Sequence, residues 1–266
     1  MNSELSAKIA GLHNQISAYE RVAVAFSGGV DSSFLAKAAR EALGKKACAL
    51  TIDTLFAPRA EIEAAAEVAR QIHIPHETIV LTELEAPILE NTRERCYLCK
   101  KSIFMALKDA ARQKGISHLI EGSNLDDLDD FRPGMKALEE MGVESPLIMA
   151  GFSKADIRQA SKAAGLSTWD KPSQACLASR IPYEWKITPE NLKMVEAAEA
   201  FLRQKGFRQL RVRCHGELAR IEVSPGERRL FFDEAVLNEV SERLKQIGFK
   251  YVAIDAEGYK TGKLNI

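Results

Sequence analysis

The chain has 266 residues, of which 46% are hydrophobic, so it is long and apolar enough for one large domain or two smaller ones with real cores. Its 37 basic and 37 acidic residues cancel, which argues against recruitment of nucleic acid or a membrane by an overall field. The N-terminus lacks a basic and apolar leader, and no apolar run approaches about 18 residues, so we expect a cytoplasmic protein.

Strand and helix patterns alternate through the first two thirds of the chain. Helical spacing predicts a lead-in helix over residues 3–19. Strands are then predicted at 22–26, 47–52, 76–81 and 118–121, and helices at 32–43, 58–72, 97–114 and 154–164. This order predicts an α/β fold with a doubly wound parallel sheet, whose ligands bind at the carboxyl ends of the strands.

A glycine-rich hexapeptide directly follows the first predicted strand and consists of Ser27, Gly28, Gly29, Val30, Asp31 and Ser32. Its glycines allow a sharp turn and a close approach of the backbone to a ligand. Its N–H groups, with a helix N-terminus behind them and two hydroxyls beside them, predict a phosphate socket. Its aspartate indicates a bridging Mg²⁺ rather than direct phosphate binding. The Lys of a Walker A loop and the spacing of a dinucleotide fingerprint are absent, and the alternative is a tight turn without ligand.

Acidic residues follow two further strands at the same edge of the predicted sheet. Asp53 is a candidate contact on the nucleoside side of a nucleotide. Asp127 is a candidate Mg²⁺ ligand or a residue that orders its loop. Both acids are equally understood as turn formers.

The pattern changes after residue 170. Residues 171–187 lose periodicity and form a predicted linker or active-site loop. Thr188 precedes a first-turn proline, which is typical of a helix start, and that helix is expected to end near Gly206. Strands at 209–215, 218–224 and 250–255, with a helix at 233–247, complete the pattern. We therefore predict one domain at 1–170 and a smaller α+β domain at 188–266.

Five cysteines in an intracellular chain favour catalysis or metal binding over disulfides. Cys96 and Cys99 form a CxxC at a helix start among basic residues, which favours thiolates, and Cys176 lies in the irregular loop. Cys48 and Cys214 fit apolar strand positions. The first three could hold a [4Fe–4S] cluster with one open iron, form a persulfide or disulfide relay, bind zinc, or be structural.

An alternating strand places Arg211, Arg213 and His215 on one face. If the next strand pairs with it in antiparallel fashion, Arg220 and Glu222 join them in a charged platform. Such arginines suit carboxylate or phosphate groups, although a solvated face or a subunit contact would give the same pattern.

Together these motifs identify a family. The hexapeptide SGGVDS resembles the PP-loop of the ATP pyrophosphatase superfamily, whose fold is adenine nucleotide alpha hydrolase-like. Four further motifs follow it along the chain. They are the CxxC, Asp126-Asp127 with the FRPG of residues 131–134, the PSQACLASRIPY of residues 172–183, and the Arg-Val-Arg of residues 211–213. Over nearly its whole length the chain is similar to the LarE-type sulfur transferases, and the cysteine loop and arginine strand are the most specific parts.

The resemblance implies a reaction. Such enzymes use ATP and Mg²⁺ to adenylate a carboxylate of pyridinium-3,5-biscarboxylic acid mononucleotide, then convert it to a thiocarboxylate for the nickel-pincer nucleotide of lactate racemase. In one design the cysteine at the position of Cys176 gives up its own sulfur. In the other, matched here by Cys96 and Cys99, three cysteines hold a [4Fe–4S] cluster whose open iron carries sulfur from a sulfide or persulfide donor.

The resemblance also implies roles for further residues and partners. Lys100 or Lys101 would offset charge during adenylation. The substrate would be bound by Arg211 and Arg213 at its phosphate, with Arg180, Glu199 and Glu222 in the same site. The C-terminal domain would build a homo-oligomer, typically a hexamer.

Three rival functions remain at this stage. A tRNA thiolation enzyme would need an RNA-binding surface, which the zero net charge disfavours. An amide-forming synthetase would need ammonia and no cysteine trio. A nucleotide-binding sensor would bind ATP without releasing pyrophosphate.

Overall fold

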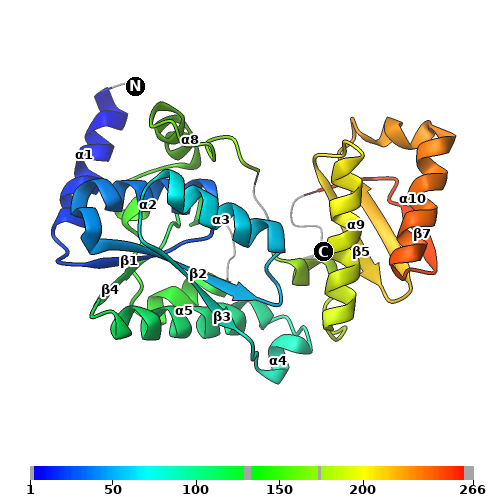
Figure 1. The fold of residues 1–266 in the computed structure, drawn as a ribbon, viewed down its shortest axis with the longest axis horizontal. Coiled ribbons are helices and arrows are strands. Elements are labelled where there is room, and N and C mark those ends of the chain that lie inside the picture. Colours follow the sequence, from blue (N-terminus) through cyan, green and yellow to red (C-terminus); the bar gives the residue numbers. More distant parts are fainter. Residues whose placement is uncertain (1–2, 129–132, 173–174, 261–266) are drawn as a thin grey trace. The chain divides into compact units, whose positions relative to one another are not determined.

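The structure is a computed structural model that describes residues 3–128, 133–172 and 175–260 (Figure 1). The chain divides into two compact units. The first consists of Met1–Leu84 and Cys96–Gln174, and the second of Glu85–Arg95 and Ala175–Ile266. The sequence placed residues 85–95 in the N-terminal domain, whereas in the structure they pack with the second unit. Their bonds to the cysteine loop, described below, are the physical reason.

The first unit is built on a parallel four-stranded sheet with the order β3-β2-β1-β4. Its strands are β1 (Val22–Ala25), β2 (Ala47–Thr54), β3 (His76–Leu81) and β4 (His118–Ile120). Val22 lies beside Ala47 of β2 and His118 of β4, which defines the register of β1 with both of its neighbours. This sheet confirms the predicted α/β class, and the SGGVDS loop leaves its carboxyl edge.

Helices cover both faces of this sheet (Figure 1). On one face, Val22 and Val24 join a core with α1 (Ser3–Ser17), α2 (Val30–Leu43), α3 (Arg59–Gln71) and α8 (Lys154–Ala163). On the other face, Ala23 packs with side chains of α5 (Arg95–Gln113). The period-two alternation of β1 therefore distributes its residues between two cores. Two short helices, α6 (Pro133–Glu140) and α7 (Pro146–Met149), complete the unit.

The second unit contains a three-stranded sheet with the order β5-β6-β7. Strands β5 (Leu210–His215) and β6 (Leu218–Val223) pair antiparallel, and β7 (Tyr251–Ile254) adds parallel to β6. Helices α9 (Pro189–Gln204) and α10 (Glu234–Ile247) pack on this sheet, and α4 (Ala86–Leu89) belongs to the same unit. The antiparallel pairing that would form a charged platform is confirmed, because Arg211 lies opposite Glu222 and Arg213 opposite Arg220.

The predicted helix starts are formed by side-chain caps. Thr188 accepts a hydrogen bond from the amide of Asn191, with a proline at the first helical position of α9. Ser153 and Asp156 form a complete capping box at α8. The helix after the SGGVDS loop begins at Val30, two residues earlier than the sequence pattern indicated. Helices α4, α6 and α7 were not predicted, since segments of four to eight residues are too short to show helical periodicity.

No helix in the described ranges is long and apolar enough to cross a membrane.

Residues 131–132 of the FRPG motif and 173–174 of the PSQACLASRIPY motif lie outside the described residues.

Candidate functional site

The SGGVDS loop of the first unit presents the N-terminus of α2 without a side-chain cap. Gly28 has φ of +66°, and a Cβ there would lie 2.7 Å from the Cα of Ala65 in α3. Only glycine therefore lets the loop pass α3 so closely. The hydroxyls of Ser27 and Ser32 lie 3.1 Å apart and tie the two ends of the loop together. The start of α2 therefore has no side-chain cap, and amides at such a helix start can bind an anion. The phosphate socket expected from the sequence stays a prediction.

Asp31 lies in the first turn of α2 and contacts two side chains from other loops. The ammonium of Lys154, at the start of α8, forms an ion pair with its Oδ2. The amide of Asn124 donates to its Oδ1 over 3.5 Å. The charge of the candidate Mg²⁺ ligand is therefore balanced by a lysine in this structure.

A second lysine reaches the same loop. Lys171 donates to the carbonyl oxygen of Gly28 over 3.1 Å and lies 2.7 Å from a carboxylate oxygen of Glu61. Gly122, in the loop after β4, lies close to the start of α2, since a Cβ at this position would be 3.0 Å from the Ser32 nitrogen. Segments after β1 and β4 and at the α8 start thus converge on one socket.

The two other acidic residues predicted for this edge have local partners. Asp53, at the end of β2, forms a two-pronged ion pair with Arg59, with an Nη1–Oδ2 distance of 2.7 Å. Asp127 accepts the backbone N–H of Asn124 over 3.0 Å and completes a capping box there. Of the two roles considered for Asp127, this contact corresponds to loop ordering, and Asn124 in turn contacts Asp31.

The CxxC lies in the first turns of α5. Cys96 and Cys99 are three residues apart in this helix, so they lie on one face of it. Cys96 is exposed and Cys99 is half-buried. The Lys101 side chain is exposed, and its ammonium lies 5.8 Å from the ring centroid of Tyr97.

Cys176 is exposed in the second unit, directly before a 3₁₀ helix, η3 (Leu177–Arg180). The fully buried Arg180 secures this turn, because its Nη1 donates to the carbonyl oxygens of Ala175 and Cys176 over 2.7 and 3.0 Å. Its Nε and Nη2 donate to Glu199 of α9 over 2.8 and 2.9 Å. The turn that carries the exposed Cys176 thiol is therefore held in place by the buried Arg180–Glu199 ion pair.

Glu199 is 1% exposed and serves as the centre of this network. It also accepts the N–H of Val212, at the open edge of β5, over 3.1 Å and a bond from Arg203 over 3.1 Å. Burial alone would raise the pKa of Glu199, but the hydrogen bonds and charge of Arg180, with the charges of Arg211 and Arg203, outweigh it and lower that pKa. The carboxylate is ionised at neutral pH.

A second buried acid, Glu222, pairs with the next arginines. Its Oε2 accepts from Nε and Nη2 of Arg213 over 3.1 and 3.0 Å, and its Oε1 accepts from Arg220 over 3.0 Å. Arg213 also donates to the carbonyl of Ser179 over 2.6 Å, in the turn after Cys176. Three members of the predicted platform, Arg211, Arg213 and Glu222, are thus buried, whereas His215 and Arg220 are half-buried.

Arg211 differs from the other arginines of this cluster, Arg180, Arg203, Arg213 and Arg220, because it has no carboxylate partner in the described part of the chain. It donates to the carbonyl of Leu210 over 2.7 Å and lies 5.1 Å from the ring of Tyr259. Burial and the nearby charge of Arg180 lower the pKa of Arg211. Arginine nevertheless stays charged in proteins, so this buried cation is available to an anion.

Two residues of the segment before the CxxC, Asn91 and Arg95, also form hydrogen bonds to the loop that carries Cys176. Asn91, which is buried with φ of +61°, donates to the carbonyl oxygens of Ile181 and Pro182 over 3.2 and 2.6 Å. Arg95 donates to the carbonyl of Ala178 over 3.1 Å and also to Asn91. Arg95 is one of the basic residues beside the CxxC that were expected to favour thiolates, and its guanidinium is directed to the cysteine loop instead.

The remaining cysteines are in the cores, as expected for Cys214, which is 1% exposed, and in part for Cys48, which is half-buried. All five cysteines lie in the described ranges, and none forms a disulfide. Within those ranges no three His, Cys, Asp or Glu side chains are gathered around a metal-sized space.

Sequence reasoning missed Lys154, Lys171, Asn91 and Asn124. One signal was available for Lys154, since a cation in the first turn of a helix opposes the helix dipole and calls for a nearby anion. The contacts of Lys171 and Asn91 span 143 and 90 or more positions of the chain, and no local pattern reports them.

Comparison with known proteins supports the nucleotide-binding character of the first unit. A family profile described as asparagine synthase matches residues 10–111, which include the SGGVDS loop and the CxxC. The match leaves out the rest of the chain, including Cys176 and the arginine strand.

Three curated proteins match over most of their length. An uncharacterized protein of Synechocystis is 41% identical over 262 residues, which cover 98% of each chain. The pyridinium-3,5-bisthiocarboxylic acid mononucleotide synthase of Lactiplantibacillus plantarum is 35% identical over 264 residues, or 98% of this chain and 95% of its own. An uncharacterized protein of Methanocaldococcus jannaschii is 30% identical over 242 residues, or 91% and 92%. The similarity thus extends through both units.

Proposed function

This chain belongs to the LarE family, which includes the pyridinium-3,5-bisthiocarboxylic acid mononucleotide synthase of Lactiplantibacillus plantarum, and on that basis we propose the reaction that it catalyses. The substrate is pyridinium-3,5-biscarboxylic acid mononucleotide. ATP activates one of its carboxylates, and sulfur then replaces the activated oxygen to give a thiocarboxylate. The observation that carries the proposal is the pairing, in one chain, of an uncapped SGGVDS socket with an exposed Cys176 positioned by buried arginine.

The first step is adenylation. A substrate carboxylate oxygen attacks the α-phosphorus of ATP, the bond between the α-phosphorus and its bridging oxygen breaks, and pyrophosphate leaves. The amides at the start of α2 and the ammonium groups of Lys154 and Lys171 supply positive charge for the phosphates. Asp31 would hold Mg²⁺ once Lys154 moves from it to the phosphates. We assign Asp53 to the nucleoside side, from its place at the carboxyl edge of the sheet, and Lys101 to charge compensation.

The second step is sulfur transfer. A sulfur nucleophile attacks the acyl carbon, and the bond to the AMP oxygen breaks, so AMP leaves. We propose that Cys96, Cys99 and Cys176 hold a [4Fe–4S] cluster. Their chemistry fits, because each is a thiol outside any disulfide and none is in a hydrophobic core. When bound, such a cluster supplies one iron without a protein ligand, at which an external sulfur ligand can be carried.

Covalent structure supports a shared role for the CxxC and Cys176. Arg95 is bonded to Cys96 in the chain, and its guanidinium donates to Ala178, two residues beyond Cys176. Asn91 binds the end of the same loop. These contacts lie within the second unit and connect the backbone before Cys96 to the Cys176 turn.

Arg211 is the best-supported group for the substrate phosphate. In its cluster, five arginines face three acidic side chains, and only Arg211 has no carboxylate of its own among the described residues. We propose that Arg213 assists it while Arg180, Glu199 and Glu222 hold the scaffold of the site. From the sequence, Arg180, Glu199 and Glu222 were expected in the substrate site beside Arg211 and Arg213, and we now propose an indirect role for these three residues. Assembly into a hexamer through the C-terminal domain stays a prediction.

The test is a reaction of the purified, anaerobically reconstituted protein with ATP, Mg²⁺, the biscarboxylic acid mononucleotide and sulfide. We expect pyrophosphate release that depends on the mononucleotide and a product in which sulfur replaces oxygen. Replacement of the mononucleotide by bulk tRNA should give neither. Pyrophosphate release stimulated by tRNA, or an amide product formed from ammonia, would overturn the proposal.

A matched pair of variants separates the two steps. Cys176→Ser should abolish the thiocarboxylate but retain pyrophosphate release. Cys214→Ser is the control, since its buried thiol lies 3.4 Å from the Gly216 carbonyl and a hydroxyl can keep that bond. Equal loss of pyrophosphate release in both would show that the Cys176 effect is structural.

A further inference from the structure

The first unit has a second region of concentrated positive charge, at the end of the sheet opposite the SGGVDS loop. Here the strands begin rather than end, and a cavity of ≈ 380 Å³ opens between the starts of β2 and β3 and the C-terminal end of α5. A cavity of this size is in the range of small-molecule sites. Its lining includes Arg21, Lys45, Lys46 and Lys114.

The cations come from three separate parts of the chain. Arg21 directly precedes β1, Lys45 and Lys46 form the turn into β2, and Lys114 follows α5. The guanidinium of Arg21 bends toward the α5 end, since a Cβ at Gly115 would lie 3.5 Å from its Nη1. Like charges gathered around one concavity repel each other, and an anion between them removes that cost.

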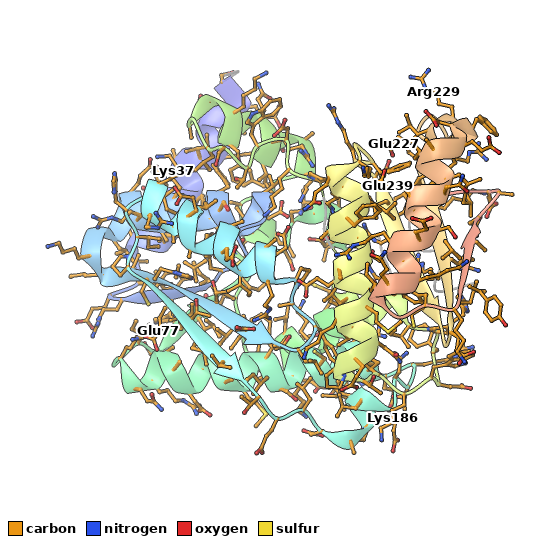
Figure 2. The ribbon with its side chains drawn as sticks, turned by 45° about the vertical axis from the view of Figure 1, so that its right-hand side comes forward. Lys37, Glu77, Lys186, Glu227, Arg229 and Glu239 are labelled. Atoms are coloured by element: carbon orange, nitrogen blue, oxygen red, sulfur yellow. The ribbon has the colours of Figure 1, made fainter. Side chains whose placement is uncertain are left out.

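One carboxylate partly compensates these cations. Glu77, labelled in Figure 2 at the start of β3, forms an ion pair with Lys114. It is the single acidic residue among those lining the cavity. His76 also lines it, with a ring nitrogen 2.8 Å from the hydroxyl of Thr51. Burial lowers the pKa of that imidazole below its ordinary value, which disfavours a positive charge on it. The lining thus keeps an excess of positive charge.

The floor of the cavity is formed by the sheet. Cys48 in β2 is half-buried there, between Ala47 and Ala49, whose side chains pack into the opposite core. Burial raises the pKa of the Cys48 thiol despite the charges of Lys114 and Arg21, so the thiol adds no negative charge. A neutral floor under a cationic rim suits a compact anion that is larger than a single phosphate.

We propose that this cavity is a second anion site, separate from the SGGVDS socket, which binds the diphosphate group of a small molecule. A diphosphate presents several oxygens to cations on different sides, which matches the three chain segments around the rim. The same chemistry is present in free pyrophosphate and in a nucleoside diphosphate. The fold separates the two sites, because the strands that end at the socket begin at this cavity.

The test uses Cys48 as a local reporter. The intact protein is alkylated at the cysteines, with chelator present and Mg²⁺ absent, and each cysteine is quantified by peptide mass spectrometry. We expect inorganic pyrophosphate to slow alkylation of Cys48 in a saturable manner at ~0.15 M salt, an ionic strength that screens diffuse surface attraction. A parallel titration with ADP distinguishes the sources, since protection by ADP at lower concentration than by pyrophosphate would identify a nucleotide ligand.

Charge variants keep the test independent of folding. The double variant Arg21→Gln/Lys46→Gln should raise the half-protecting concentration at least about tenfold, from the loss of two charges near the anion. The control Lys37→Gln/Lys136→Gln removes the same charge from α2 and α6, outside the cavity, and should leave protection unchanged. Glu77→Gln should strengthen protection several-fold, a gain that misfolding cannot produce.

Three results would overturn the proposal. They are an absence of Cys48 protection by either anion, equal loss of protection in the two double variants, and a Cys48 thiol that no reagent reaches in the folded protein. The last would mean that the cavity is closed.

Discussion

The anion sites that we propose in the two units are built in different ways. In the first unit the SGGVDS socket uses backbone amides, and glycine makes room for it. In the second unit the site below Cys176 uses buried guanidinium groups, which are held by Glu199 and Glu222. The SGGVDS socket depends on the space left by glycine, whereas the arginine site depends on paired buried charges. Different substitutions should therefore disrupt the two sites.

The largest expected effect is in the second unit. Glu199→Gln keeps the shape of the side chain but leaves Arg180 buried without a counter-charge. We expect a loss of about 3–5 kcal/mol in the free energy of unfolding, measured by denaturant titration. The matched control is Arg203→Gln, which removes the 40% exposed partner of the same carboxylate and should cost at most about 1 kcal/mol. Equal losses in the two variants would contradict a charge-balanced core.

The pH dependence of stability sharpens the same point. The pKa of Glu199 is lower in the folded protein than in the unfolded chain. Its contribution is therefore fully present above the unfolded value of about 4.3 and is lost as pH falls through the folded value. The stability difference between wild type and Glu199→Gln should shrink as pH drops below about 4. A difference that is constant with pH would mean that the carboxylate is not ionised in the fold.

In the first unit, we expect the largest effect from a substitution that fills the space at Gly28. Gly28→Ala combines a left-handed backbone with a Cβ 2.7 Å from the Ala65 Cα. We expect a loss of about 2–4 kcal/mol in thermal or denaturant unfolding, together with loss of ATP binding. Gly11→Ala in helix α1 is the control in the same unit, because a Cβ at this position would meet no atom within 4 Å. It should raise the free energy of unfolding by a few tenths to about 1 kcal/mol, since alanine favours helix over glycine.

A charge change in the socket should affect catalysis rather than folding. Lys154→Gln removes a cation from the phosphates, and we expect pyrophosphate release to slow by about 10²-fold, in kcat rather than in KM. In the nucleotide-free protein Asp31 loses its ion-pair partner, so Mg²⁺ should bind more tightly in calorimetric titration. Unchanged Mg²⁺ binding with full activity would mean that the Lys154–Asp31 pair is a surface contact only.

The smallest effect is expected where charges are exposed. Glu239 on α10, labelled in Figure 2, lies 2.5 Å from the ammonium of Lys205, and their side chains are 50% and 33% exposed. Glu239→Gln should change the free energy of unfolding by no more than about 1 kcal/mol. A loss comparable to that of Glu199→Gln would show that burial does not explain the difference between these pairs.

The sequence predicted the parts of the molecule that depend on local patterns. The individual strands of the parallel sheet, the SGGVDS turn and the cap at Thr188 each arise from short local patterns, and the structure contains them. The alternation of residues 210–215 also predicted which side chains share a face, and Arg213 and Glu222 do meet there.

What the sequence did not reveal depends on residues far apart in the chain. Lys154 meets Asp31 across 123 positions, and Asn91 meets Pro182 across 91. The same applies to the burial of the arginine face, since alternation gives a face but not what covers it. Arg95 shows the consequence, because a basic residue beside a CxxC suggested thiol activation, whereas its contacts hold the Cys176 loop.

The central claim is that this protein transfers sulfur repeatedly, with Cys96 and Cys99 as essential partners of Cys176. The most direct measurement is the number of thiocarboxylate molecules formed per chain, in wild type and Cys96→Ala, from anaerobic protein with excess ATP, mononucleotide and sulfide. We predict several products per wild-type chain, and none from Cys96→Ala while its pyrophosphate release continues. At most one product per wild-type chain, with Cys176 converted to dehydroalanine, would contradict the account and identify Cys176 as the sulfur that is consumed.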